Sequence, residues 1–125
     1  MSSMLNIKDW SVAGARNALT ATQIIAKLAH LEDWRLSGGD EGGPALAIEK
    51  TYTFANYFET IAFVNALAFV AHAQDHHPDL MVHYNRCVVR FNTHDVGGIS
   101  QTDMDCAAQI EALLPVPAAT LKDAV

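Results

Sequence analysis

Hydrophobic and polar positions along the chain repeat in some segments with the period of a helix and in others with the alternation of a strand. These two patterns predict its helices and strands. Thr20 and Gln23 have the spacing of a capping box, in which each side chain satisfies a free amide at a helix start. The helix that follows has an apolar face of four residues: Ile24, Ile25, Leu28 and Leu31. The longest helix is predicted over residues 56–74.

A last helix is predicted to begin at Ser100 or Thr102 and to run to about Leu114, before Pro115 and Pro117. Its inward positions are predicted to be Ala107, Ile110, Leu113 and Leu114.

Four other segments have the alternation or the residue types of strands: 34–36, 45–54, 80–84 and 87–93. Between the first two, residues 38–44 read Gly-Gly-Asp-Glu-Gly-Gly-Pro, which is a strong turn signal and makes a hairpin plausible. The element order is therefore α-β-β-α-β-β-α. It predicts an α+β fold, in which a four-stranded antiparallel sheet carries helices on one face.

The helix over residues 56–74 is apolar on nearly every side, so more than one neighbour has to cover it. The sheet covers one side, and we expect a second subunit to cover another, in a homodimer or homotetramer. Phe58, Phe63 and Phe69 are predicted to lie in the core rather than to line a cofactor site.

Composition narrows the function classes. The chain has 125 residues and a formal net charge of −6, with no basic stripe, which argues against direct nucleic-acid binding. Its longest apolar run is too short to span a bilayer, and its first twenty residues lack the apolar segment of a secretory signal. Cys87 and Cys106 are not paired in a motif, so we expect reduced thiols and a cytoplasmic location.

Domain organisation is predicted to be simple. Residues 19–114 form one domain, residues 1–18 an N-terminal extension and residues 115–125 a C-terminal tail.

Histidines carry the candidate chemistry. Four of the six lie within a dozen positions and a fifth follows: His72, His76, His77, His83 and His94. Imidazole titrates near neutral pH, which suits proton transfer in both directions. Adjacent His76 and His77 serve one pocket only if their loop departs from strand geometry. Continued alternation would place His94 on the strand face of Arg90 and Asn92.

A zinc site is an alternative, because His72 and His76 are four residues apart on a predicted helix. The glutamate of the zinc-protease pattern is absent, since Ala73 follows His72. We predict no metal and interpret His72 as a helix-end residue. His30 and His83 are given no role.

Two acidic residues near these histidines have structural interpretations. Asp75 either orients a histidine or caps the loop, and the two roles are equally compatible with the sequence. Asp103, three residues after Ser100, is predicted to cap the last helix.

A wider pattern resembles a known family. The spaced set that carries the resemblance is His72-x3-His76-His77-Pro78, Tyr84, His94 and Asp103, within Asp75-His76-His77-Pro78-Asp79, Thr93-His94-Asp95 and Gly98-Ile99-Ser100. It is similar to the signature of the pterin-4a-carbinolamine dehydratases, and the similarity covers about residues 19–114.

This resemblance implies removal of water from 4a-hydroxytetrahydropterin, the product of aromatic amino acid hydroxylases, to give quinonoid dihydropterin for tetrahydropterin recycling. It implies no cofactor and no metal. His76, His77 and His94 would share the acid and base roles. The implied substrate-binding positions are Asp75, Asn92, Thr93 and Asp95. His72 stands where the family commonly has glutamate, so its accessory role is open.

The resemblance also leaves a non-enzymatic alternative. Some members of this family act as dimerisation partners of a homeodomain transcription factor or as regulators of hydroxylase expression. A functional link to a hydroxylase is expected in the enzymatic case, and an interaction protein of the same fold is the alternative.

Overall fold

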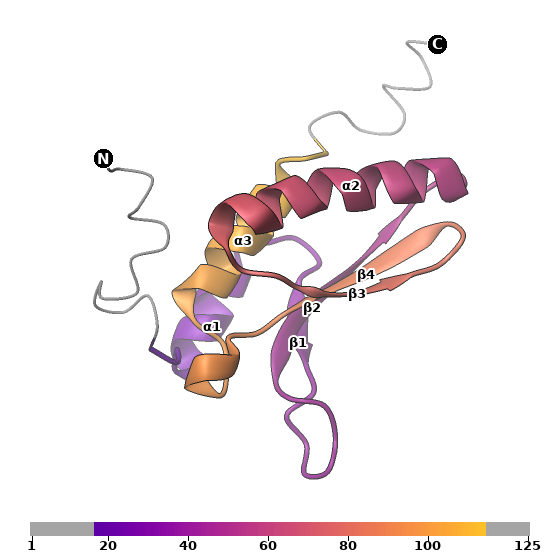
Figure 1. Cartoon of the computed structure of the whole chain (residues 1–125). Helices are drawn as coiled ribbons and strands as arrows, with labels where there is room; N and C mark the ends of the chain where they lie inside the picture. Colours follow the sequence, from indigo (N-terminus) through magenta and orange to yellow (C-terminus); the bar gives the residue numbers. More distant parts are fainter. Residues whose placement is uncertain (1–16, 115–125) are drawn as a thin grey trace, which may run out of the picture.

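The computed structural model of the chain describes residues 17–114, and its elements follow the predicted order (Figure 1). The helices are α1 (Ala21–Leu28), α2 (Tyr57–Gln74) and α3 (Gln101–Glu111), and a 3-10 turn, η2, covers His94–Val96. The strands are β1 (Arg35–Ser37), β2 (Ala47–Thr53), β3 (Asp79–Val82) and β4 (Arg86–Phe91). Most of the predicted N-terminal extension, 1–16, and all of the predicted tail, 115–125, lie outside the described residues.

All four strands pair antiparallel, in the order β1-β2-β4-β3. The three helices lie on one side of this sheet, with α2 running over β4 and β3 (Figure 1). The predicted α+β fold is therefore confirmed. No helix within residues 17–114 combines the length and apolar character needed to cross a membrane.

Side-chain caps fix where the helices begin. The predicted capping box of α1 is present, because the Gln23 amide donates to Thr20 Oγ1 and the Thr20 amide donates to Gln23 Oε1. In α2, Asn56 Oδ1 accepts from the Glu59 amide at 2.9 Å. Ser100, rather than Thr102, is the N-cap of α3.

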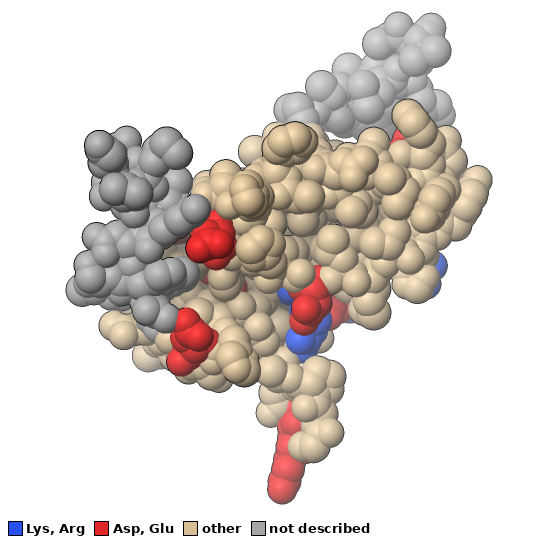
Figure 2. Space-filling view, in the orientation of Figure 1, with Lys and Arg blue, Asp and Glu red and all other residues tan. Residues whose placement is uncertain are grey.

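The loop between β1 and β2 projects from the sheet and has an acidic tip (Figure 2). Arg90 closes its base by donating to the carbonyl oxygens of Ser37 and Ala45. Gly38 has a positive φ of 81° beside this guanidinium group, where a Cβ atom would collide with it. The turn predicted from the glycines is thus fixed by a cross-strand arginine.

The core lies between the sheet and α2, and it shows which stripe of α2 faces inward. The buried residues of this helix are Thr60, Phe63, Leu67, Ala71 and Gln74. Phe58 and Phe69 lie on the opposite side, each 81 % exposed, so the prediction that they belong to the core is wrong within one subunit. Because this helix is apolar on nearly every side, its sequence does not indicate which face is buried. The position of the sheet decides which face that is.

Two residues of the predicted apolar helix faces are exposed. Ile25 is 64 % exposed and Leu114 is 45 % exposed, whereas Ile24 and Ile110 are buried. Leu114 follows the end of α3 at Glu111, and Ile25 lies beside Ile24, the buried residue of α1.

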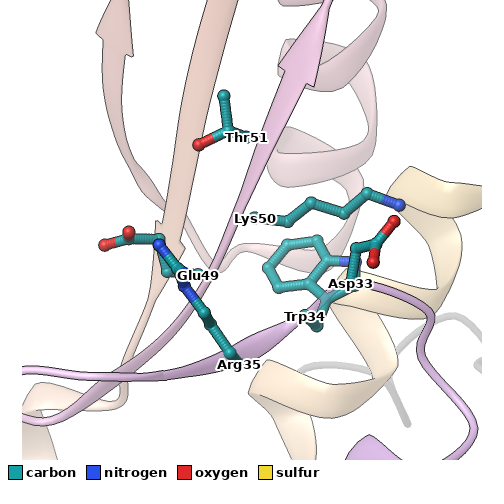
Figure 3. Close-up of a pocket in the computed structure, with 6 residues that line it drawn as sticks. All are labelled: Asp33, Trp34, Arg35, Glu49, Lys50 and Thr51. Atoms are coloured by element: carbon teal, nitrogen blue, oxygen red, sulfur yellow. The ribbon is translucent and has the colours of Figure 1, made fainter.

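A carboxylate fastens the last turn of α3 to the sheet. Glu111 Oε2 accepts from Trp34 Nε1 at 3.1 Å, from Lys50 Nζ at 2.7 Å and from the Tyr52 hydroxyl. Beside it is a cleft of about 450 Å³, whose lining side chains Figure 3 shows. The residues lining this cleft are Asp33, Trp34, Arg35, Glu49, Lys50 and Thr51.

Burial alone would raise the pKa of Glu111, but hydrogen bonds from Lys50, Tyr52 and Trp34 outweigh it, and the pKa lies below its ordinary value. Burial, together with the charge of Glu111, raises the pKa of Tyr52. The cluster therefore holds an ionised glutamate against a neutral tyrosine.

Glu111→Gln should lower the free energy of unfolding by about 1–2 kcal/mol at pH 7, because the charged acceptor of three donors is lost. The lowered folded-state pKa means that this stabilisation is present above the unfolded pKa and disappears as pH falls through the folded value. Urea unfolding of both proteins from pH 7 to pH 3 measures this difference. Asp105→Asn, an exposed change on the same helix, is the control and should stay within about 0.5 kcal/mol of wild type. A gap between Glu111→Gln and wild type that does not change with pH would contradict the assignment.

Candidate functional site

Three segments converge on one cleft of about 320 Å³ at the end of α2. They are the loop after α2, the end of β4 and the turn η2. The residues lining the cleft are Asp75, His76, His77, Asn92, Thr93, His94 and Asp95. The structure therefore brings together every residue that the family resemblance placed at the catalytic and substrate-binding positions.

The end of α2 explains how two adjacent histidines share one cleft. Asp75 has the left-handed conformation, with φ 54° and ψ 40°, and its amide bonds back to carbonyl groups in the last turn of the helix. The His76 amide also bonds back, to the Ala71 carbonyl at 3.1 Å. Because β3 begins only at Asp79, His76 and His77 are not held to strand geometry, and both line the cleft.

The end of β4 supplies the other wall of the cleft. The strand ends at Phe91, earlier than predicted, and His94 enters the cleft from η2 rather than as a continuation of the strand. Thr93 forms a bridge with Gly98, and its amide donates to the Gly98 carbonyl at 2.8 Å. Gly97, with a φ of 68°, allows the chain to turn back so that Gly98 meets Thr93.

His76 is the most constrained histidine of the site. Its Nε2 lies 2.5 Å from Asp103 Oδ1, and its ring is stacked on Phe91 at a centroid distance of 5.8 Å. Only 11 % of its side chain is exposed. His77 and His94, in contrast, are exposed at the cleft.

Asp103 is fully buried and is the centre of a hydrogen-bond network. Its Oδ2 accepts from the Ser100 amide at 2.9 Å and from the Thr93 hydroxyl at 2.7 Å, while Oδ1 faces His76. The predicted capping role is confirmed by the Ser100 contact. Both residues belong to the family pattern, but their contact leaves no local or periodic signal, because the two positions are 27 apart and meet only in the folded chain.

The network determines how protons are placed. The Thr93 hydroxyl donates to Asp103, so the Ser100 hydroxyl, 2.6 Å away, donates to Thr93 Oγ1. An ionised carboxylate only accepts hydrogen bonds. With Asp103 Oδ1 as the acceptor, we assign the proton of His76 to Nε2, and Nδ1 is then the acceptor nitrogen of the neutral ring.

Other candidate residues lie outside the cleft. His72 is exposed in the last turn of α2 and does not line the cleft, and His30 and His83 are exposed elsewhere. Within residues 17–114, no group of three or more histidine, cysteine, aspartate or glutamate side chains is arranged to hold a metal ion.

The two cysteines are buried and unpaired. Burial and the nearby charge of Asp103 raise the pKa of the Cys106 thiol to about 12, and burial raises that of Cys87. Since the thiolate is the nucleophile, neither cysteine is suited to covalent catalysis.

Comparison with known proteins shows the family of the chain. Residues 17–113 match the family model described as pterin 4 alpha carbinolamine dehydratase. The chain belongs to the pterin-4a-carbinolamine dehydratase family. A relative from Paracidovorax citrulli that bears the family's name is 67 % identical over 113 residues, covering 90 % of this chain and 94 % of the relative. Another relative, from Stenotrophomonas maltophilia, is 52 % identical over 100 residues, which cover 80 % of this chain and 82 % of the relative.

Solved structures share the fold. A transcriptional coactivator/pterin dehydratase from Brucella melitensis aligns with a TM-score of 0.69 and 29 % identity, covering 77 % of this chain and 97 % of that one. A pterin dehydratase-like protein identified as a RuBisCO assembly factor aligns with a TM-score of 0.53 and 24 % identity. The alignment covers 67 % of this chain and 92 % of that one. The second likeness concerns the fold alone.

Asp103→Asn should change the proton position on His76, since an amide presents a donor as well as an acceptor to the network. We expect the ¹⁵N ring shifts of His76 to show the Nε2–H form in the wild type and a mixture of forms in the variant. The free energy of unfolding should fall by about 2 kcal/mol, because buried donors lose their charged partner. Asp105→Asn, two residues away and exposed, should leave both readouts unchanged. An Nδ1–H form of His76 in the wild type would contradict this assignment.

Proposed function

We propose that this protein dehydrates 4a-hydroxytetrahydropterin to quinonoid dihydropterin by histidine acid–base catalysis. The observation that carries the proposal is the convergence of His76, His77 and His94 on one open cleft, in a chain that belongs to the dehydratase family. The cleft volume of about 320 Å³ is at the lower end of the range for small-molecule sites, which suits a bicyclic head group.

The reaction needs two proton transfers and no change of oxidation state. The C4a hydroxyl takes a proton and leaves as water, while N5 loses its proton and forms the C4a–N5 double bond. An acid and a base on opposite sides of this bond are sufficient. Imidazole, with an ordinary pKa of about 6.5, serves either role near neutral pH.

The three histidines divide into two kinds. His77 and His94 have exposed rings at the cleft and reach it from different segments, so they are the groups that exchange protons with the substrate. His76 is held by Asp103 and Phe91, which leaves Nδ1 as its acceptor nitrogen and suits a fixed position against the pterin.

Polar residues around the histidines would hold the pterin ring. Asn92 is half-buried in the cleft wall and offers an amide donor and acceptor, and Asp75 and Asp95 offer carboxylates at its rim. The Thr93 hydroxyl is committed to Asp103, so its contribution to binding is the geometry of the wall. The biological role that follows from this chemistry is tetrahydropterin recycling in the cytoplasm beside an aromatic amino acid hydroxylase.

Purified protein at micromolar concentration should accelerate the loss of carbinolamine absorbance in a hydroxylase reaction. His77→Ala and His94→Ala should each reduce kcat/KM by about 100-fold or more, as expected for loss of a general acid or base. His83→Ala removes an exposed histidine outside the cleft and should retain wild-type activity. An unchanged decay rate with wild-type protein would refute the proposed activity.

Chelation tests the zinc alternative raised by His72 and His76. We expect dialysis against EDTA to leave kcat/KM unchanged, because His76 Nε2 is already occupied by Asp103 and His72 lies outside the cleft. Elemental analysis of the purified protein is the accompanying measurement. Stoichiometric zinc that is lost together with activity would favour a metal site.

A further inference from the structure

The Ser100 hydroxyl is a buried polar group that the proposed chemistry does not use. Ser100 is fully buried and does not line the cleft. Its backbone joins it to α3, because its amide donates to Asp103 Oδ2 at 2.9 Å and its carbonyl accepts from the Asp103 amide at 3.1 Å. Its hydroxyl instead lies 2.6 Å from Thr93 Oγ1, seven residues earlier in the chain.

This hydroxyl begins a chain of hydrogen bonds that ends at His76. The Thr93 hydroxyl donates its one proton to Asp103 Oδ2 at 2.7 Å, and it therefore accepts the proton of the Ser100 hydroxyl. The other oxygen of the carboxylate, Oδ1, faces His76 Nε2. Three hydrogen bonds thus link a residue outside the cleft with a histidine that lines it.

The members of this chain are shielded from water. Thr93 is 4 % exposed, Asp103 is fully buried, and 11 % of the His76 side chain is exposed. A hydroxyl that accepts a hydrogen bond is also a stronger donor, since hydrogen bonds in a chain polarise one another. Loss of the Ser100 hydroxyl would therefore leave a buried lone pair of Thr93 unsatisfied and weaken the bond from Thr93 to Asp103.

We propose that Ser100 is a positioning residue for His76, acting through Thr93 and Asp103. Its hydroxyl holds Thr93 Oγ1 in place, and Thr93 together with the Ser100 amide holds Oδ2 of the carboxylate. Oδ1 is then presented to His76 in one orientation. Because the stacked Phe91 ring restrains the tilt of the imidazole, the contact with Asp103 determines its rotation within the ring plane.

The consequence for catalysis rests on the proposed function. A reacting group that is misplaced by about 1 Å can cost about 100-fold in rate. Ser100→Ala keeps the contact between Asp103 and His76 and loosens only its support. We therefore expect a smaller effect on kcat/KM, about 10-fold.

Kinetics of three variants separate the hydroxyl from the rest of the side chain. Ser100→Ala should lower kcat/KM for the carbinolamine about 10-fold, whereas Ser100→Thr keeps the hydroxyl and should retain most of the wild-type value. Thr20→Ala is the matched control, since it removes the N-cap hydroxyl of α1, which does not line the cleft, and it should keep wild-type kcat/KM. Equal losses in folded Ser100→Ala and Ser100→Thr would indicate a packing effect and overturn the proposal.

NMR of the free protein measures the position of His76 without substrate, so this readout does not depend on the proposed function. In the wild type, the Nε2 proton of His76 should give a resolved signal that exchanges slowly with water. Ser100→Ala should raise its exchange rate about fivefold or more, and Thr20→Ala should leave it unchanged. An unchanged exchange rate and unchanged ring ¹⁵N shifts in Ser100→Ala would overturn the proposal. A wild type that does not dehydrate the pterin would refute only the proposed function.

Discussion

The buried carboxylate of Asp103 holds the functional end of this molecule together. An ionised group inside a protein is costly unless each of its oxygens has donors, and Asp103 has three of them: the Ser100 amide, the Thr93 hydroxyl and His76. These donors come from the start of α3, the end of β4 and the loop after α2. One side chain therefore caps a helix, closes a turn and fixes the ring of a proposed catalytic histidine.

The helix that carries Asp103 is attached at both ends by acidic side chains. Asp103 lies in the first turn of α3, and Glu111, at its last residue, accepts from Trp34, Lys50 and Tyr52. The two clusters differ in their exposure, since Asp103 is fully buried while the Glu111 side chain is 30 % exposed. Changes at Glu111 should thus act mainly on stability, whereas changes at Asp103 reach the geometry of the cleft.

α2 has a different role on each side. Its inner stripe packs on the sheet through Phe63 and Leu67, and its C-terminal end delivers His76 and His77 to the cleft. Its outer stripe carries Phe58 and Phe69, which are exposed within one subunit. An apolar helix was expected from the sequence to need two neighbours, and within the described residues the sheet covers one side of it.

The sequence by itself determined the element order, the capping box at Thr20, the Gly-rich turn and, through the family pattern, the residues that gather at the cleft. These follow from local periodicity, side-chain caps and spacing. Only the tertiary structure decided that Phe58 and Phe69 face outward and that His76 meets Asp103, 27 residues away. Both depend on how the helices dock on the sheet, and a uniformly apolar helix or a distant hydrogen bond leaves no periodic signal along the chain.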